Sequence, residues 1–115
     1  MARVIGIDVS KLRLDVYRLE DGRCLAVGND AAGIAALADQ LGLSARDLLA
    51  MEAWGGYERR AQRHLSERGL RVAIVNAARV RDFARASGRL AKTDRVDAAV
   101  IVRYGAFARP ARPRW

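Results

Sequence analysis

Four acidic residues of this sequence have the chemistry and the positions of ligands for divalent metal ions: Asp8, Glu52, Asp94 and Asp97. Asp8 and Glu52 each end an apolar run typical of a buried strand, where a charge is costly unless it is paired or binds metal. Asp94 and Asp97 are three residues apart, which places both on one face of a helix. Carboxylate oxygens favour Mg²⁺ or Mn²⁺, and two such ions promote attack on a phosphodiester. We therefore expect these four residues to be metal ligands and catalytic residues.

Each acid, taken alone, also has a structural explanation. Asp8 could begin a hairpin turn, and Glu52 could cap the turn at Gly55 and Gly56. Asp94 is a good N-cap for a helix with Asp97 in its first turn. The sequence leaves these explanations open for single residues, and the occurrence of all four together favours the metal site.

Basic residues near the acids could bind a nucleic-acid backbone. Arg81, Arg85 and Arg89 recur every four residues and would form a stripe along a helix. Three further basic residues are close to the acids in the sequence: Lys11, Lys92 and Arg95. A solvated surface is the alternative for all six. The aromatic residues near Glu52, Trp54 and Tyr57, could stack on bases, although packing is the favoured interpretation.

The distribution of charge supports a polyanionic partner. The formal net charge of the 115 residues is +8, of which residues 79–115 carry +7 and residues 1–78 carry +1. The single cysteine, Cys24, is followed by apolar residues and is expected to be a buried thiol in a reducing compartment. Short apolar runs and the lack of a signal-like segment lead us to expect a cytoplasmic, nucleoid-associated protein without a membrane partner.

The hydrophobic pattern predicts the elements that would position these residues. Strands are expected at residues 4–8, 12–16, 24–27, 48–52 and 72–75. Asp30 and Gly42 bound a first helix, residues 57–69 form a second, and two more helices follow around Val80 and after Asp94. The order βββαβαβαα predicts an α/β fold with a mixed five-stranded sheet of order 3-2-1-4-5. That is the ribonuclease-H-like arrangement, and it puts Asp8 and Glu52 at one sheet edge; the first half of an actin-like ATPase domain fits the same order.

Three segments resemble the motifs of one protein family. They are Gly6-Ile-Asp-Val-Ser-Lys11, residues 51–58, and residues 80–98 with the core Lys92-Thr-Asp-Arg-Val-Asp-Ala98. They resemble the RuvC-like DEDD transposases of insertion sequences, which include Piv-type invertases and RNA-guided, serine-containing recombinases. Two departures, Trp54 in place of a common threonine and Ala77 in place of a common proline, do not touch an acid. The resemblance implies that the four acids are catalytic, with Mg²⁺ or Mn²⁺ as cofactor. It also implies DNA as substrate, a structured guide RNA and a homo-oligomer.

The resemblance also sets the expected domain organisation. Residues 1–108 would form the RuvC-like domain, and residues 109–115 a basic, proline-containing tail or truncated linker. Members of the family continue into a domain with a catalytic serine that none of Ser10, Ser44, Ser66 and Ser87 matches. We therefore expect a transposase fragment that is incompetent for transposition alone. Two alternatives stay open: a non-catalytic nucleic-acid-binding relic and, less favoured because no glycine follows Asp8 closely, an actin-like ATPase fragment.

Overall fold

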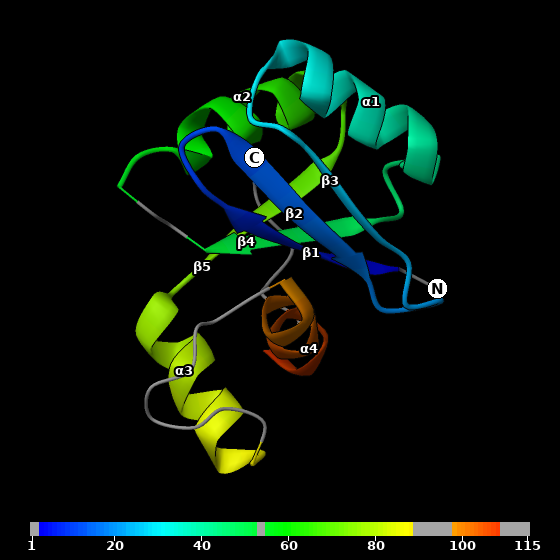
Figure 1. Cartoon of the computed structure of the whole chain (residues 1–115). Coiled ribbons are helices and arrows are strands. Elements are labelled where there is room, and N and C mark those ends of the chain that lie inside the picture. Colours follow the sequence, from blue (N-terminus) through cyan, green and yellow to red (C-terminus); the bar gives the residue numbers. More distant parts are fainter. Residues whose placement is uncertain (1–2, 53–54, 89–97, 109–115) are drawn as a thin grey trace.

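The computed structural model describes residues 3–52, 55–88 and 98–108. A five-stranded sheet of order β3-β2-β1-β4-β5 lies between two pairs of helices (Figure 1). The strands are β1 (Val4–Val9), β2 (Arg13–Arg18), β3 (Cys24–Gly28), β4 (Leu48–Glu52) and β5 (Arg71–Val75). The helices are α1 (Ala31–Leu41), α2 (Glu58–Glu67), α3 (Ala77–Ala86) and α4 (Ala98–Ala108). The predicted α/β fold and its strand order are confirmed.

The strand directions follow from the connections. Short turns join β1, β2 and β3, which therefore pair antiparallel, and Gly22 with a φ of 70° lies in the turn between β2 and β3. Helices α1 and α2 connect β3 to β4 and β4 to β5, so that β4 lies parallel to both β1 and β5. The carboxyl ends of β1, β3, β4 and β5 consequently meet at one edge of the sheet, called the carboxyl edge below.

Helix α1 shows how local signals define an element. The Asp30 side chain accepts a 2.7 Å hydrogen bond from the backbone N–H of Gly33, which caps the first turn. Gly42 ends the helix with a φ of 59°, a conformation that glycine adopts without strain. The buried face consists of Ile34, Leu37, Ala38 and Leu41. Both predicted ends of this helix and its predicted buried face are confirmed.

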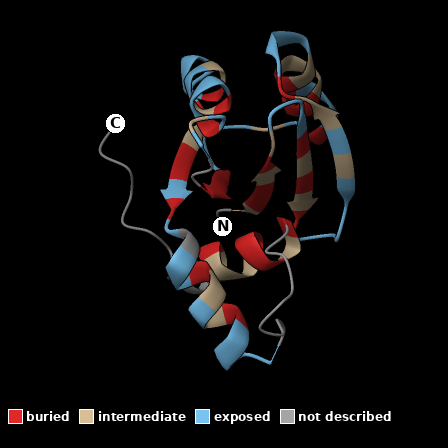
Figure 2. Ribbon diagram, turned by 60° about the vertical axis from the view of Figure 1, so that its left-hand side comes forward, coloured by how far each residue is buried: buried red, intermediate tan, exposed pale blue. Residues whose placement is uncertain are grey.

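The sheet separates two apolar cores. The larger one lies on the side of α1 and α2, and its β1 and β4 residues are Ile5, Ile7, Val9, Leu49 and Met51. The smaller one lies on the side of α3 and α4 and contains Ala50, Val75, Val80, Ala84, Val100 and Ile101. Figure 2 shows the buried residues in the strands and on the helix sides that face them. Alternate residues of β1 and β4 therefore point to different helical layers.

Two sequence predictions about single residues are wrong. Leu12 was assigned to the second strand, but it is 79% exposed in the turn, which Ser10 closes by donating its backbone N–H to Arg13 O at 2.9 Å. Cys24 was expected to be buried, but it is exposed. Because β3 is an edge strand, Leu25 packs toward the larger core while Cys24 points to the opposite face, beyond the cover of α4.

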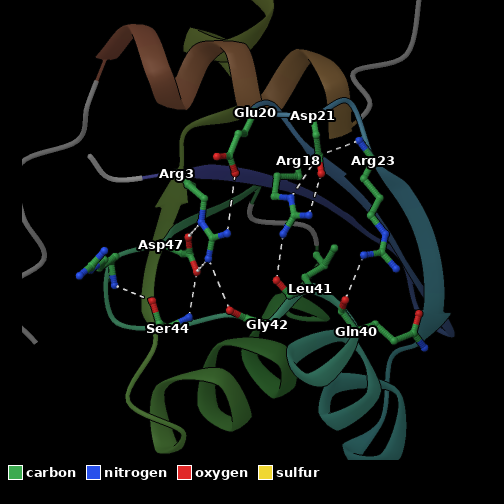
Figure 3. A network of polar contacts seen from close by, with 11 residues as sticks. Arg3, Arg18, Glu20, Asp21, Arg23, Gln40, Leu41, Gly42, Ser44 and Asp47 are labelled. Carbon is green, nitrogen blue, oxygen red and sulfur yellow. Dashed lines mark hydrogen bonds and ion pairs between the residues drawn. The ribbon is translucent and has the colours of Figure 1, made fainter.

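Arginine–carboxylate contacts hold the edge opposite the carboxyl edge, called the amino edge below (Figure 3). Arg3 donates to the fully buried Asp47 side chain, with Nε 2.6 Å from Oδ1. Arg18 donates to Asp21 at 2.7 Å and to the carbonyl oxygen of Leu41 at 2.9 Å. These contacts join the β2–β3 turn, the end of α1 and the start of β4. Arg3 and Arg18 are thus occupied by structural contacts.

None of the helices in the described part of the chain is both long and apolar enough to span a bilayer.

Candidate functional site

Asp8 and Glu52 lie side by side at the carboxyl edge. The parallel register of β1 and β4 pairs Gly6 with Ala50 and Ile7 with Met51, so that Asp8 and Glu52 occupy the next position. Neighbouring strands are about 4.8 Å apart, and the two side chains point to the same face because both positions continue that register. Glu52 is only 9% exposed and Asp8 is half-buried. The structure therefore brings these two predicted site residues together.

Helix α4 packs directly over these strands, because glycine lets the backbones approach. A Cβ atom on Gly6 would collide with the carbonyl oxygen of Ala98 and lie 2.7 Å from the backbone nitrogen of Val102. Gly105 makes a similar approach, since a Cβ atom there would be 3.1 Å from the Cβ of Ala50. The first described residue of α4, Ala98, therefore lies against β1 two residues before Asp8. Asp8 and Glu52 face this helical layer.

The other two predicted ligands, Asp94 and Asp97, lie outside the described residues. Within the described ranges, no group of three or more His, Cys, Asp or Glu side chains is arranged to hold a metal ion. Asp8 and Glu52 supply two neighbouring carboxylates, a donor set whose chemistry fits Mg²⁺ or Mn²⁺. The chemistry of the pair thus fits two of the four predicted ligands.

A groove of about 590 Å³ opens beside Asp8, next to α4, on the part of this sheet face that α4 does not cover. Asp15 lies in its wall directly opposite Asp8 in the β1–β2 register, and it forms a 2.7 Å ion pair with Arg13. The remaining lining includes Tyr17, Cys24 and Ala26 from the sheet and Ala98 and Ala99 from α4. Asp15 is not among the predicted ligands, and its carboxylate is paired with Arg13, although the β1–β2 register places it on the face of Asp8.

The groove wall is tied to α4 by an arginine. The guanidinium of Arg103 lies 5.5 Å from the centre of the Tyr17 ring, close enough for a cation–π contact. The same guanidinium donates to the carbonyl oxygen of Ala99 at 2.9 Å. Arg103 therefore connects Tyr17, a residue of the groove wall, to α4.

Comparison with known proteins agrees with this geometry. The model of the DEDD transposase family named for IS110, described as Transposase, matches residues 5–113. The chain belongs to this transposase family. Among curated proteins, no significant match was found. A RuvC of T. thermophilus, solved in complex with a Holliday junction substrate, shares the fold with a TM-score of 0.56 over 95% of each chain and 14% identity. The predicted family and the RuvC-like fold are thus confirmed.

The predicted basic residues of the transposase domain are placed only in part. Arg85 is exposed on α3, and its Nη1 lies 3.9 Å from Asp82 Oδ1. Arg81 is half-buried on the same helix. The buried side of α3 is formed by Val80 and Ala84, as predicted. Lys11 is exposed in the β1–β2 turn. The other three, Arg89, Lys92 and Arg95, lie outside the described residues, as does Trp54.

Tyr57 departs from its expected place in a packed helix stripe. It immediately precedes α2 and is 40% exposed, and the buried positions of α2 are Glu58, Ala61 and Leu65. Ala61 and Leu65 are buried as predicted, and only the first position of the stripe differs: Glu58 faces inward in place of Tyr57 and accepts a 3.1 Å hydrogen bond from the backbone N–H of Gly56. The aromatic ring of Tyr57 is consequently available at the carboxyl edge.

Proposed function

We propose that this chain is the domain of a DNA transposase that binds divalent metal ions through Asp8, Glu52, Asp94 and Asp97 and cleaves DNA strands. The observation that carries the proposal is the neighbouring placement of Asp8 and Glu52 on parallel strands, facing α4. Asp97 immediately precedes Ala98, the residue that packs against β1 at Gly6. Membership in a transposase family supports the reaction class.

The proposal assigns two tasks to the residues of this chain. The carboxylates hold the cations, and the basic residues near them position a DNA backbone. Bound Mg²⁺ or Mn²⁺ would supply activation of water and neutralisation of the charge that develops on the phosphodiester. The solved RuvC was bound to a Holliday junction, which supports DNA as the partner. A structured guide RNA and assembly with further copies of the chain stay predictions from the family resemblance.

Strand rejoining is not part of the task proposed for these residues. Transfer of a cut strand to a new partner in this family is expected to need a serine nucleophile, which requires an activating neighbour. Ser10 is close to Asp8 in the sequence, but its hydroxyl donates to the carbonyl oxygen of Arg13 at 2.9 Å inside the turn. We therefore expect metal-dependent cleavage rather than complete transposition from residues 1–115.

The test is thermal melting with and without Mn²⁺ for the parent, Asp8→Asn, Glu52→Gln and Asp15→Asn. A cation at one hundred times its Kd stabilises the folded state by about 2.7 kcal/mol, so the parent Tm should rise on addition of metal. The shift should be lost in Asp8→Asn and Glu52→Gln. Asp15→Asn is the matched control, because Asp15 lies on the same face but is paired with Arg13. An equal shift in all four proteins would contradict the assignment.

Cleavage is measured in parallel on labelled duplex and branched DNA with Mg²⁺ or Mn²⁺. The parent and Asp15→Asn should produce nicks, and the Asp8 and Glu52 variants should not. Metal binding without any nicking would leave the carboxylates as ligands and remove the catalytic part of the proposal.

A further inference from the structure

A second, smaller pocket of about 290 Å³ lies at the carboxyl edge. It is lined by Lys11, Leu12, Asn29, Gly56, Tyr57 and Arg60. These residues come from the turn after β1, the end of β3, the turn after β4 and the first part of α2. The volume is close to the lower end of the range of small-ligand sites, about 300 Å³. The pocket is thus of a size suited to one small chemical unit.

Asn29 organises the walls of this pocket. Its side chain Nδ2 donates to the carbonyl oxygen of Ser10 at 3.0 Å and to that of Tyr57 at 3.1 Å. Its backbone N–H donates to the carbonyl oxygen of Leu12 at 3.0 Å, and its own carbonyl oxygen accepts from Arg60 at 3.1 Å. Asn29 is 5% exposed. Three loops that are distant in the sequence are therefore fixed around the pocket before anything binds.

The side chain of Asn29 also carries a buried acceptor without a partner among the described residues. The Oδ1 of Asn29 is buried and has no hydrogen-bond donor among the described residues. Because Nδ2 already donates to two carbonyl oxygens, exchanging the two ends of the amide would not satisfy it. A buried acceptor without a partner is uncommon in folded proteins, so the amide of Asn29 is held in place by its two donated hydrogen bonds and not by its oxygen.

The charges at the pocket are positive and accessible. Lys11 and Arg60 are both exposed, and neither forms an ion pair with another described residue. Arg60 directs one guanidinium nitrogen to Asn29, which leaves its remaining N–H groups for a further acceptor. Arg3 and Arg18 at the amino edge are instead engaged with Asp47 and Asp21 (Figure 3). The two cations at the pocket thus favour an anionic ligand.

An aromatic ring lies beside these cations. Tyr57 is 40% exposed, and the neighbouring Leu12 is 79% exposed, so that apolar surface borders the charged groups. Proteins that hold single strands combine these two features, cations for the backbone and an aromatic ring for a base. Cations alone or an aromatic ring alone would not indicate a nucleotide. The presence of both in one pocket favours a nucleotide as the ligand.

We propose that this pocket binds one nucleotide of a single-stranded nucleic-acid segment, with its phosphodiester held by Lys11 and Arg60 and its base or sugar packed on Tyr57. The inference rests on the proposed function, because a strand held here reaches the edge that bears the carboxylates. Lys11 follows Asp8 by three residues, and Gly56 follows Glu52 by four. The pocket would therefore guide the strand toward the acidic pair.

The experiment measures fluorescence anisotropy of short labelled single-stranded DNA and RNA across a salt series, without added divalent metal. For the double variant Lys11→Ala/Arg60→Ala, we expect the slope of log K against log salt to fall by about 0.7 for each removed charge, with about fivefold weaker binding per charge near 0.1 M salt. The matched control is Arg46→Ala/Arg71→Ala. It removes two arginines that precede or begin β4 and β5 at the amino edge, and it should change binding much less.

Two single variants test the geometry. Arg60→Lys keeps the charge but not the planar fork, and it should recover part of the binding. Tyr57→Phe should bind as the parent does, because it keeps the aromatic ring. Tyr57→Ala should bind more weakly, because the stacking of one base on the ring is lost. Melting curves without nucleic acid confirm that each variant is folded before its binding is interpreted.

The outcomes separate this inference from the proposed function. A loss with DNA, with RNA or with both supports the pocket and identifies the strand it prefers. Equal losses in the double variant and in its amino-edge control overturn the pocket, since only total charge would then matter. In that case a Mn²⁺-dependent rise in Tm that is lost in the Asp8 and Glu52 variants would still support the metal site. Conversely, a pocket that binds nucleic acid while metal has no effect would overturn the metal site alone.

Discussion

Asn29 illustrates how one amide side chain can decide the shape of a site. Replacement by aspartate would put an oxygen where Nδ2 now donates to the carbonyl oxygens of Ser10 and Tyr57. The new carboxylate oxygen and the two carbonyl oxygens would then face one another with no hydrogen-bond donor between them. The free energy of unfolding should therefore fall by about 2 kcal/mol. Urea unfolding of Asn29→Asp at neutral pH measures this loss.

The control for that prediction is another asparagine. Asn76 caps α3 by accepting a hydrogen bond from the backbone N–H of Arg79, a role that aspartate fills equally well. Asn76→Asp should therefore keep the parent's urea midpoint. A similar loss in both variants would show that the added charge, and not the lost donor, is responsible.

Asp21 gives the molecule a stability that depends on acid pH. Hydrogen bonds from Arg18, followed by one from the backbone N–H of Arg23, lower the pKa of Asp21 from 3.8 to about 2. Because the folded pKa lies below the unfolded one, this contribution is present above pH 4 and is lost as the pH falls toward 2. Asp21→Asn should be less stable than the parent at neutral pH, and the difference should close within this window. Urea midpoints measured from pH 7 to pH 2 test this, and parallel curves would contradict it.

At the scale of elements, the packing of α4 on β1 depends on Gly6. Gly6→Ala would force the start of α4 away from β1, because the new Cβ would meet the backbone of Ala98 and Val102. We expect a loss of about 2 kcal/mol in the free energy of unfolding, in the range of overpacked cores. The variant should also reduce the Mn²⁺-dependent rise in Tm, because the acids of β1 and β4 face this helix.

Gly69→Ala separates those two effects. Gly69 has a φ of 78° and open space around its Cα, so alanine there costs about 1 kcal/mol of backbone strain without touching α4. The metal response of this variant should equal that of the parent. A reduced response in Gly69→Ala as well would mean that lower stability alone weakens metal binding.

The elements that could be predicted from sequence are those with local signals. Asp30, Gly42 and the apolar spacing between them defined α1 completely, and the strand order followed from the connections. Leu12 and Cys24 were misplaced because the pattern shows alternation but not where a turn ends or which face a helix covers. The contacts of Asn29 were not predictable, since they join residues 19 and 28 positions apart through a fold that must already exist.

At the scale of the whole molecule, the two edges of the sheet use their charges differently. At the amino edge, arginines meet carboxylates and carbonyl groups of the fold and join α1 to the strands. At the carboxyl edge, Asp8 and Glu52 lie on the α4 side of β1 and β4, while Lys11 and Arg60 line the pocket at the start of α2. The formal net charge of +8 therefore does not describe how the molecule meets a partner. The proposed contacts with nucleic acid depend instead on the arrangement of charge at the carboxyl edge.

The division into two unequal cores has a consequence for how the molecule opens. The larger core joins the sheet to α1 and α2, and the smaller one attaches α3 and α4. Partial unfolding that releases the smaller layer exposes less apolar surface than global unfolding, and so requires less free energy. Amide protons of α3 and α4 would then exchange with solvent through a local opening, while those of β1 and β4 wait for the global one. Asp8 and Glu52 lie on the boundary of these two cooperative units, so that a cation bound there would couple their unfolding.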